Sequence, residues 1–226
     1  MVHFDNIVEA FFDGAFERYI NEKMFYRDYA FPVDDIRIYA EKIVATPMAS
    51  FISYIRECCT VPFLEYNDIV QFSSLEDATV GIVKILDENG DEGFPFIELG
   101  KMLLNDGKER KDGAYRKYGE NHTKTAKEFG LTQVLYCKTY LSCMGKALLS
   151  LQKVEQDKLL RRLILRNKYI KLLVKLSSSE QLHLDSQMGL LSETTRVRRL
   201  SNVRKIWQLI IAEDDITQNL LSNVLA

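Results

Sequence analysis

The sequence predicts a mainly α-helical protein built from tandem winged-helix units, in which helix-turn-helix pairs are followed by short β-hairpins. Two observations carry this prediction. Apolar residues recur at helical spacing through most of the 226 residues, and short β-prone runs flank turn-like segments after the helices. Breaks in these patterns predict three domains: an acidic helical or winged-helix-like domain at 1–73, a winged-helix domain at 74–152, and a helix-turn-helix domain with a C-terminal tail at 153–226. Long flexible linkers are not expected, because the chain has 11 glycines and 4 prolines.

The first domain is expected to be helical with an acidic surface. Its predicted helices are Asp5–Met24, Val33–Ala45 and Met48–Cys58. Pro47 separates the last two of these helices. In the segment Val61–Ser73, two β-prone runs lie on either side of Asn67-Asp68, which predicts a hairpin.

The second domain is expected to begin at Ser74, a residue placed to cap a helix. Its predicted elements are a helix at Leu75–Leu86, a helix at Phe96–Leu104, a charged loop at Gly107–Asn121, a helix at His122–Thr132 with its C-cap at Gly130, and hairpin strands at Leu131–Cys137 and Thr139–Ser142. This order of helices and hairpin is typical of a winged helix.

The third domain is expected to hold a helix-turn-helix pair. Its predicted elements are a long helix at Glu155–Leu176, a break at Ser177–Ser179, a short helix at Glu180–Met188 that stops at Gly189, and a last helix from Ser192 to about Ala212. The apolar tail at Glu213–Ala226 is expected to dock on the core of the same chain or on a second subunit, which leaves a homodimer open.

The last helix carries the candidate DNA-reading face. At about 100° per residue, an apolar side that includes Val197, Leu200 and Trp207 faces the core, and Trp207 is expected to be a core anchor. Arginine and asparagine on the opposite side suit guanine and adenine edges, and hydroxyls and lysine suit phosphates. The residues of this helix expected to contact DNA are Thr194, Thr195, Arg198, Arg199, Ser201, Asn202 and Lys205. Arg196 and Arg204 are expected to flank the core edge, with contact to phosphate as their alternative role.

A second candidate face lies in the middle domain. Arg116 and Lys117 fall in the charged loop, and Thr123, Lys124, Thr125 and Lys127 fall on the helix that follows it. Threonines and lysines near a helix N-terminus suit a phosphate. A solvated helix with a mobile charged loop is the alternative interpretation.

The distribution of charge also favours a polyanionic partner. The net charge of the chain is −2, but residues 1–100 hold 7 Lys+Arg against 19 Asp+Glu, and residues 101–226 hold 23 against 13. A basic segment in an acidic protein indicates binding of a polyanion by that segment alone. The alternative interpretation is that these lysines and arginines only solvate the outer faces of helices.

Three segments carry a resemblance to a known class of domain. The segment GLLSETTRVRRLSNVRKIWQLI resembles the recognition helix of winged-helix domains in bacterial restriction-modification and phage-defence proteins, with a Ser/Thr-rich start, paired arginines and a tryptophan-anchored apolar turn. GENHTKTAKEFGLT has the Ala126-to-Gly130 spacing of helix-turn-helix motifs, and YLSCMGKALLSL is similar to the exit of a wing. The resemblance implies sequence-specific binding of double-stranded DNA, by a transcriptional regulator or a recognition component of a restriction or defence system.

Two other functions stay open at this stage. An acidic domain at 1–73 that binds a protein partner would make the chain an interaction module, and a metal-dependent nuclease could carry an unrecognised site. The sequence contains no GxSxG, HExxH or phosphate-loop motif, and Glu98 to Lys101 lacks nuclease spacing, so we expect no enzyme, no cofactor and no metal.

The four cysteines lack zinc-site spacing and are expected to be buried thiols. With no signal peptide and no long apolar run, a cytoplasmic protein without membrane contact is expected.

Overall fold

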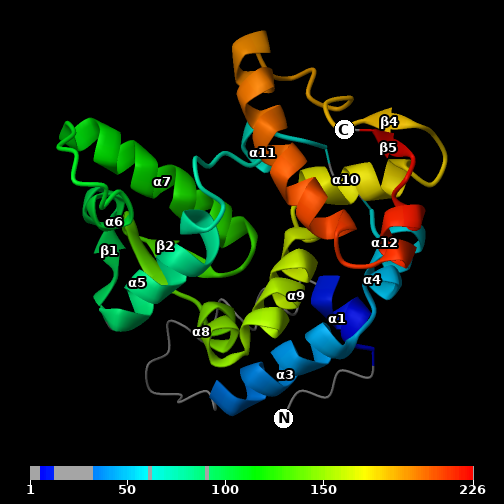
Figure 1. Ribbon diagram of the computed structural model, residues 1–226, viewed down its shortest axis with the longest axis horizontal. Coiled ribbons are helices and arrows are strands. Elements are labelled where there is room, and N and C mark those ends of the chain that lie inside the picture. Colours follow the sequence, from blue (N-terminus) through cyan, green and yellow to red (C-terminus); the bar gives the residue numbers. More distant parts are fainter. Residues whose placement is uncertain (1–5, 13–32, 61–62, 90–91, 226) are drawn as a thin grey trace. The chain divides into compact units, whose positions relative to one another are not determined.

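The computed structural model describes residues 6–12, 33–60, 63–89 and 92–225, which are mainly helical with small sheets (Figure 1). Contacts group these residues into two compact units. Unit 1 takes residues 33–41 and the described part of 71–156, and unit 2 takes residues 6–12, the described part of 42–70, and 157–225. Unit 1 resembles the middle domain expected from the sequence. The outer two expected domains do not stay separate, because helix α4 (Met48–Glu57) packs against helices near the C-terminus.

Unit 1 combines helices with a three-stranded antiparallel sheet. Its elements are a π-helical turn η2 (Asp77–Gly81), α5 (Ile82–Glu88), β1 (Phe94–Pro95), α6 (Phe96–Leu103), α7 (Asp112–Glu128), β2 (Thr132–Leu135), β3 (Lys138–Leu141) and α8 (Cys143–Ser150). The strand order is β1-β3-β2, and Thr139 of β3 lies opposite both Phe94 and Val134. The structure confirms the hairpin expected between Leu131 and Ser142.

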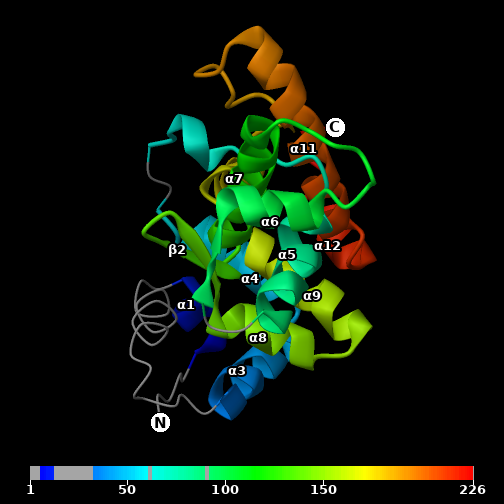
Figure 2. The same ribbon diagram turned by 90° about the vertical axis from the view of Figure 1, so that its left-hand side faces the viewer.

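The start of α7 differs from the sequence prediction. We expected a charged loop up to Asn121, but the helix already begins at Asp112 and includes Arg116 and Lys117. Two glycines explain the difference. A methyl group on Gly119 would overlap the Phe96 carbonyl oxygen, and one on Gly100 would overlap the Tyr115 carbonyl oxygen. The backbones of α6 and α7 therefore touch, which offsets the low helix propensity of glycine. Both views show these helices side by side (Figures 1 and 2).

The β2–β3 hairpin closes on a two-residue turn in an unusual conformation. Tyr136 and Cys137 both adopt left-handed backbone angles, with φ of 49° and 60°. Two-residue hairpin turns of this kind favour Asn-Gly, because side chains with a Cβ rarely adopt positive φ. Tyr136 and Cys137 are both exposed at this tip.

Unit 2 is built from segments that lie far apart in the sequence. Its elements are α1 (Ile7–Phe12), α4, a 3₁₀ turn η1 (Tyr66–Asp68), α10 (Lys168–Leu176), β4 (Leu182–His183), α11 (Glu193–Ile211), α12 (Asp215–Leu220) and β5 (Val224–Leu225). Two helices, α3 (Val33–Ala45) and α9 (Lys153–Ile164), contain the boundaries between the units.

The structure confirms the predictions for α3, α4 and α11 to within two residues at each end. Of the first predicted helix, Asp5–Met24, residues 6–12 are described, and Ile7–Phe12 form helix α1.

The hairpin expected in Val61–Ser73 is wrong for the described residues 63–73, which contain the η1 turn and no strand. Glu65 and Asp68 form a capping box around this turn, in which the Glu65 amide donates to the Asp68 carboxylate at 2.6 Å. The carbonyls of Tyr66 and Ile69 accept hydrogen bonds from the Arg199 guanidinium. Local capping and a distant arginine thus take the place of strand pairing.

Two predictions for the third domain are also wrong. The long helix Glu155–Leu176 is interrupted, because Asn167 caps α10 through its Oδ1, which accepts from the Ile170 amide at 3.2 Å. The short helix at Glu180–Met188 does not form, since Leu182 and His183 belong to strand β4. This strand pairs in parallel with β5 (right-hand side of Figure 1). The C-terminal tail therefore docks within its own chain.

A buried charged group connects several elements of unit 2. The Arg162 side chain of α9 donates to the Ile43 carbonyl at 3.1 Å and to the Thr46 carbonyl at 3.0 Å. It also pairs with the Glu213 carboxylate at 2.9 Å, and Arg161 contacts the other oxygen of that carboxylate at 2.6 Å. Arg162 is 2% exposed. It therefore supplies donors to the carbonyls at the end of α3 and to the segment that follows α11.

We predict that Arg162→Met destabilises the protein by about 3–5 kcal/mol, because the Ile43 and Thr46 carbonyls lose a buried donor and one oxygen of the Glu213 carboxylate loses its charged partner. Urea unfolding followed by Trp207 fluorescence measures the loss. Arg161→Met is the control and should cost less, since Arg161 contacts only Glu213 among the groups described above. Equal losses for the two variants would contradict the assigned role of Arg162.

A pair of glycine substitutions in α7 tests the helix contact. Gly119→Ala should destabilise unit 1 by about 1–3 kcal/mol, because α6 and α7 must separate to admit the methyl group. Gly113→Ala is the matched control, since its methyl group would enter open space. It should stabilise the same helix by about 0.5–1 kcal/mol. The two melting temperatures should move in opposite directions, and a stabilising Gly119→Ala would refute the close approach.

Candidate nucleic-acid interface

Helix α7 presents one face to the interior of unit 1 and a basic edge to solvent. The buried residues are Gly119, His122, Thr123, Thr125 and Ala126. The exposed cations of the helix are Arg116, Lys117, Lys124 and Lys127. These four cations follow one another at helical spacing, so they share one side of the helix.

Three of the four cations are available for an anion. Lys124 pairs with Glu120 at 2.7 Å, one turn away on the same helix. Among the described residues, no carboxylate forms an ion pair with Arg116, Lys117 or Lys127. The sequence placed Arg116 and Lys117 in a loop, whereas the structure brings them onto the same helix as Lys124 and Lys127.

Thr123 and Thr125 do not face solvent, which corrects their assignment as DNA contacts. The Thr123 hydroxyl lies 3.0 Å from the Thr139 hydroxyl of β3, and the Thr125 hydroxyl donates to the Gln71 carbonyl at 3.1 Å. Both side chains are at most 2% exposed. They attach α7 to the sheet and to the segment before η2, so they position the basic edge without being part of it.

His122 fixes the same helix to the start of η2. Its Nε2 accepts from the amides of Ser73 and Ser74 at 3.3 Å, and its Nδ1 lies 2.7 Å from the Tyr118 carbonyl. Since Nε2 accepts, the proton lies on Nδ1 and the ring is neutral. Burial lowers the pKa of His122, which disfavours the charged form. Tyr118 stacks on this ring and donates to Asp77 at 2.6 Å.

The segment before α7 offers less free charge than its sequence suggests. Arg110 makes two hydrogen bonds of 2.6 Å to the Asp106 carboxylate. This guanidinium holds the pKa of Asp106 well below its usual range. Arg110 is therefore already paired, in contrast to Arg116 and Lys117.

Helix α11 is rotated from the orientation that its sequence suggests. Arg199 and Asn202 are 4% and 7% exposed, so these two predicted DNA contacts point into unit 2, while Val197, predicted in the core, is 60% exposed. The reason is the η1 segment, whose carbonyls bind the Arg199 guanidinium. That guanidinium also lies over the Tyr66 ring, 4.0 Å from its centroid. Because Arg199 is buried, its side of α11 faces the core, and Val197 on another side of the helix faces solvent.

The remaining predicted residues of α11 lie at or near the surface. Thr194, Arg198, Ser201 and Lys205 are exposed, and Thr195 is half-buried beneath the Ser192 hydroxyl, which donates to it at 3.0 Å. The position of Ser192 just before the helix predicts a side-chain cap, but the Ser192 side chain does not cap α11. Trp207 is 2% exposed, which confirms it as a core residue. Because no helix forms at 180–188, the expected helix-turn-helix pair before α11 is wrong.

Two exposed residues, Gln208 and Tyr136, were not singled out from the sequence. Gln208 lies on the outer surface of α11, and Tyr136 projects from the hairpin tip with 93% of its surface exposed. Arg204, which we expected at the edge of the core, is exposed as well, because the buried Arg199 lies on another side of the helix. The positive backbone angles at Tyr136 have no sequence signal, since glycine and asparagine usually mark such turns.

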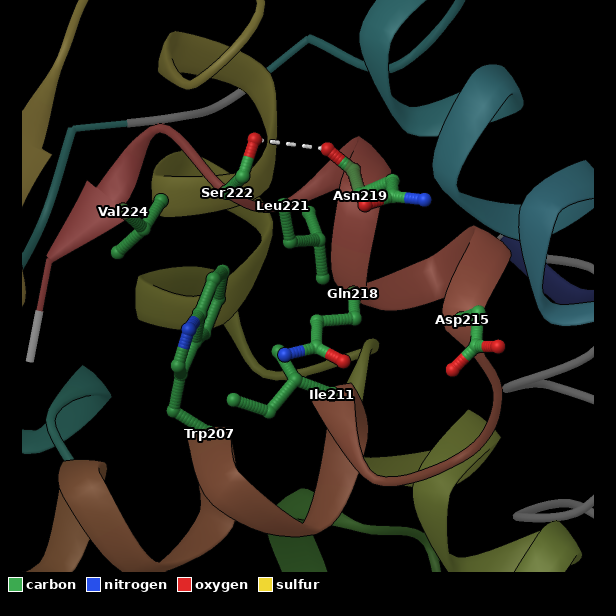
Figure 3. A pocket seen from close by; sticks show the side chains of 8 residues that line it. All are labelled: Trp207, Ile211, Asp215, Gln218, Asn219, Leu221, Ser222 and Val224. Atoms are coloured by element: carbon green, nitrogen blue, oxygen red, sulfur yellow. Dashed lines mark hydrogen bonds between the residues drawn. The ribbon is translucent and has the colours of Figure 1, made fainter.

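A pocket of about 550 Å³ lies beside Trp207 in unit 2 (Figure 3). Its apolar lining includes Trp207, Leu221 and Val224, and its polar lining includes the amide of Gln218 and the carboxylate of Asp215. The Ser222 hydroxyl is engaged with the Asn219 carbonyl at 2.8 Å. The lining therefore offers amide groups and one carboxylate, and it contains no histidine or cysteine.

The cysteines differ from the expected buried thiols. All four are free, but Cys58 and Cys137 are exposed and Cys59 and Cys143 are half-buried. Among the described residues, no three His, Cys, Asp or Glu side chains are grouped to hold a metal ion. In the same residues, no helix has the length and apolar character needed to cross a membrane.

Comparisons of the chain with protein-family models, with curated proteins and with solved structures found no match. The geometry of the two units is therefore the basis for assigning a function.

We predict that acid destabilises unit 1 through His122. The folded-state pKa lies below the unfolded value of about 6.5, so the unfolded chain takes up the proton more readily. The contribution of the neutral ring is complete above about pH 6.5 and is lost as the pH falls below it. Melting temperatures of wild type and His122→Gln between pH 7.5 and 5.0 provide the test. The wild-type curve should fall more steeply on acidification, and parallel curves would contradict the prediction.

Proposed function

We propose that the protein binds double-stranded DNA through unit 1, with α7 as the reading helix and the β2–β3 hairpin as a wing. The order α5-β1-α6-α7-β2-β3, with strand order β1-β3-β2, supports a winged-helix arrangement for this unit. In helix-turn-helix proteins the second helix of the pair enters the major groove. Here that helix is α7, and the observation that carries the proposal is its edge of unpaired cations.

The dimensions of this edge suit a duplex. From Arg116 to Lys127 the helix rises about 17 Å at 1.5 Å per residue, compared with a major groove about 12 Å wide. Arg116 and Lys117 lie in the N-terminal half of α7, where residues on both sides are exposed. That half is therefore accessible for groove entry, while the C-terminal half is held by His122 and the two buried threonines.

The hairpin tip supports a second contact with the same duplex. Tyr136 is almost fully exposed, and Lys138 follows it on β3. A tyrosine hydroxyl and a lysine ammonium both donate hydrogen bonds to phosphate oxygens. A strained turn that presents an aromatic side chain to solvent is typical of a functional position.

Within this proposal, the role is that of a transcriptional regulator or of a DNA-recognition component in a restriction or defence system. The cytoplasm fits such a role, since free cysteines persist in a reducing compartment. The alternative of an acidic protein-binding domain at 1–73 has less support, because the described residues of that segment are divided between the two units.

We predict that Arg116→Ala/Lys117→Ala weakens binding to a mixed-sequence duplex. The slope of log affinity against log salt should become shallower by about 2, because each lost phosphate contact removes about 0.9. Fluorescence anisotropy at several salt concentrations measures both quantities.

The matched control for this experiment is Lys84→Ala/Lys146→Ala, which removes two exposed charges from α5 and α8 of the same unit. If the position of the charges on α7 matters, and not merely the net charge of the protein, the control should retain a salt slope within about 0.5 of wild type. Unchanged binding by the α7 variant, at an unchanged melting temperature, would show that α7 is not the reading helix.

A further inference from the structure

The outer face of α11 in unit 2 is a second cationic surface, and its orientation is fixed by what the helix buries. Val203, Ile206, Trp207 and Ile210 pack into the core, and Arg199 binds the η1 carbonyls. A 19-residue helix anchored at both halves in this way has one defined outward side.

That side carries cations and hydroxyls in a continuous row. Its members are Thr194, Arg198, Ser201, Lys205 and Gln208, and all are exposed. They recur at steps of four and three residues, so they fall within about 80° of arc at 100° per residue. Arg204 lies exposed along the flank of this row. The row extends over about 21 Å of helix at 1.5 Å per residue.

Neutralisation of this face by the described residues is slight. The only acidic residue in α11 is Glu193, which lies 3.7 Å from Arg196 at the start of the helix. Arg198 donates from Nε to the Thr194 carbonyl at 3.4 Å. Within the described part of the chain, no carboxylate pairs with Arg198, Arg204 or Lys205. Three cations on one face without acidic neighbours favour an anionic partner.

The composition of the face distinguishes between anionic partners. Proteins that bind single strands stack bases on exposed aromatic side chains, but Trp207 is the only aromatic residue of α11 and it is buried. Val197, in contrast, is an exposed apolar side chain beside the cationic row. An apolar contact with the thymine methyl group, next to arginines that reach guanine, is a major-groove combination.

We infer that the outer face of α11 is a second contact for double-stranded DNA, made by Arg198, Arg204 and Lys205 with Val197 beside them. This contact goes beyond the proposed function of unit 1 and does not depend on it. It needs none of the residues of α7, and its own residues retain the predicted DNA contacts Arg198 and Lys205 while excluding the buried Arg199 and Asn202.

The test uses the full chain and a mixed-sequence 30-base-pair duplex, with affinity measured by anisotropy at several salt concentrations. The triple variant Arg198→Ala/Arg204→Ala/Lys205→Ala should bind at least about tenfold more weakly, with a salt slope shallower by about 2–3. The control variant Lys42→Ala/Lys84→Ala/Lys146→Ala removes three exposed cations elsewhere and should change the slope by less than about 1. Arg198→Lys/Arg204→Lys keeps the charge and should retain the wild-type salt slope.

The outcomes separate this inference from the proposed function. If the α11 triple variant melts normally and binds like its control while Arg116→Ala/Lys117→Ala loses binding, the α11 contact is wrong and the α7 proposal stands. If only the α11 variant loses binding, the α11 contact stands and the α7 proposal is wrong. Loss in both sets supports both contacts. If both variants bind DNA like wild type, both proposed contacts are wrong, and an acidic protein surface becomes the candidate partner of the α11 cations.

Discussion

The contact between the backbones of α6 and α7 determines where the proposed reading helix of unit 1 can lie. Gly100 and Gly119 face each other's helices with no room for a methyl group. α7 extends as one helix from Asp112 to Glu128, which brings its exposed cations onto one side. His122, Thr123 and Thr125 then fix its C-terminal half by hydrogen bonds to other segments of unit 1. The inner side of α7 holds small and polar residues, and the lysines and arginines of the helix lie on its outer side.

Buried and half-buried guanidinium groups have the corresponding role in unit 2. Arg56 donates to the Val174 and Leu220 carbonyls, Arg162 to those of Ile43 and Thr46, and Arg199 to those of Tyr66 and Ile69. The last carbonyls of a helix lack a partner within the helix, so each arginine adds a strong donor where the ladder of backbone hydrogen bonds ends. Unit 2 therefore uses several of its cations internally, and a count of basic residues overstates its surface charge.

The two proposed DNA contacts differ in how their charge is arranged. On α7, Lys124 is paired with Glu120, and the unpaired cations lie on either side of it along the helix. On α11, the acidic Glu193 is confined to the first turn and the unpaired cations follow it. A cation with no acidic neighbour can bind a phosphate without the free-energy cost of breaking an existing ion pair. In both helices, the proposed function depends on which cations the fold leaves unpaired.

The sequence by itself determined the mainly helical class, the positions of α3, α4, α6 and α11, and the β2–β3 hairpin, because apolar periodicity and turn residues act locally. It also identified Trp207 as a core residue and Arg198 and Lys205 as exposed. Only the tertiary structure decided that α7 begins at Asp112, that Leu182–His183 is a strand, and that Arg199 and Asn202 are buried. Each of these depends on a partner distant in sequence: the α6 backbone for α7, β5 for β4, and the η1 carbonyls for Arg199. A pattern read along one helix cannot contain the position of such a partner, because packing and hydrogen bonding across the unit override local preference.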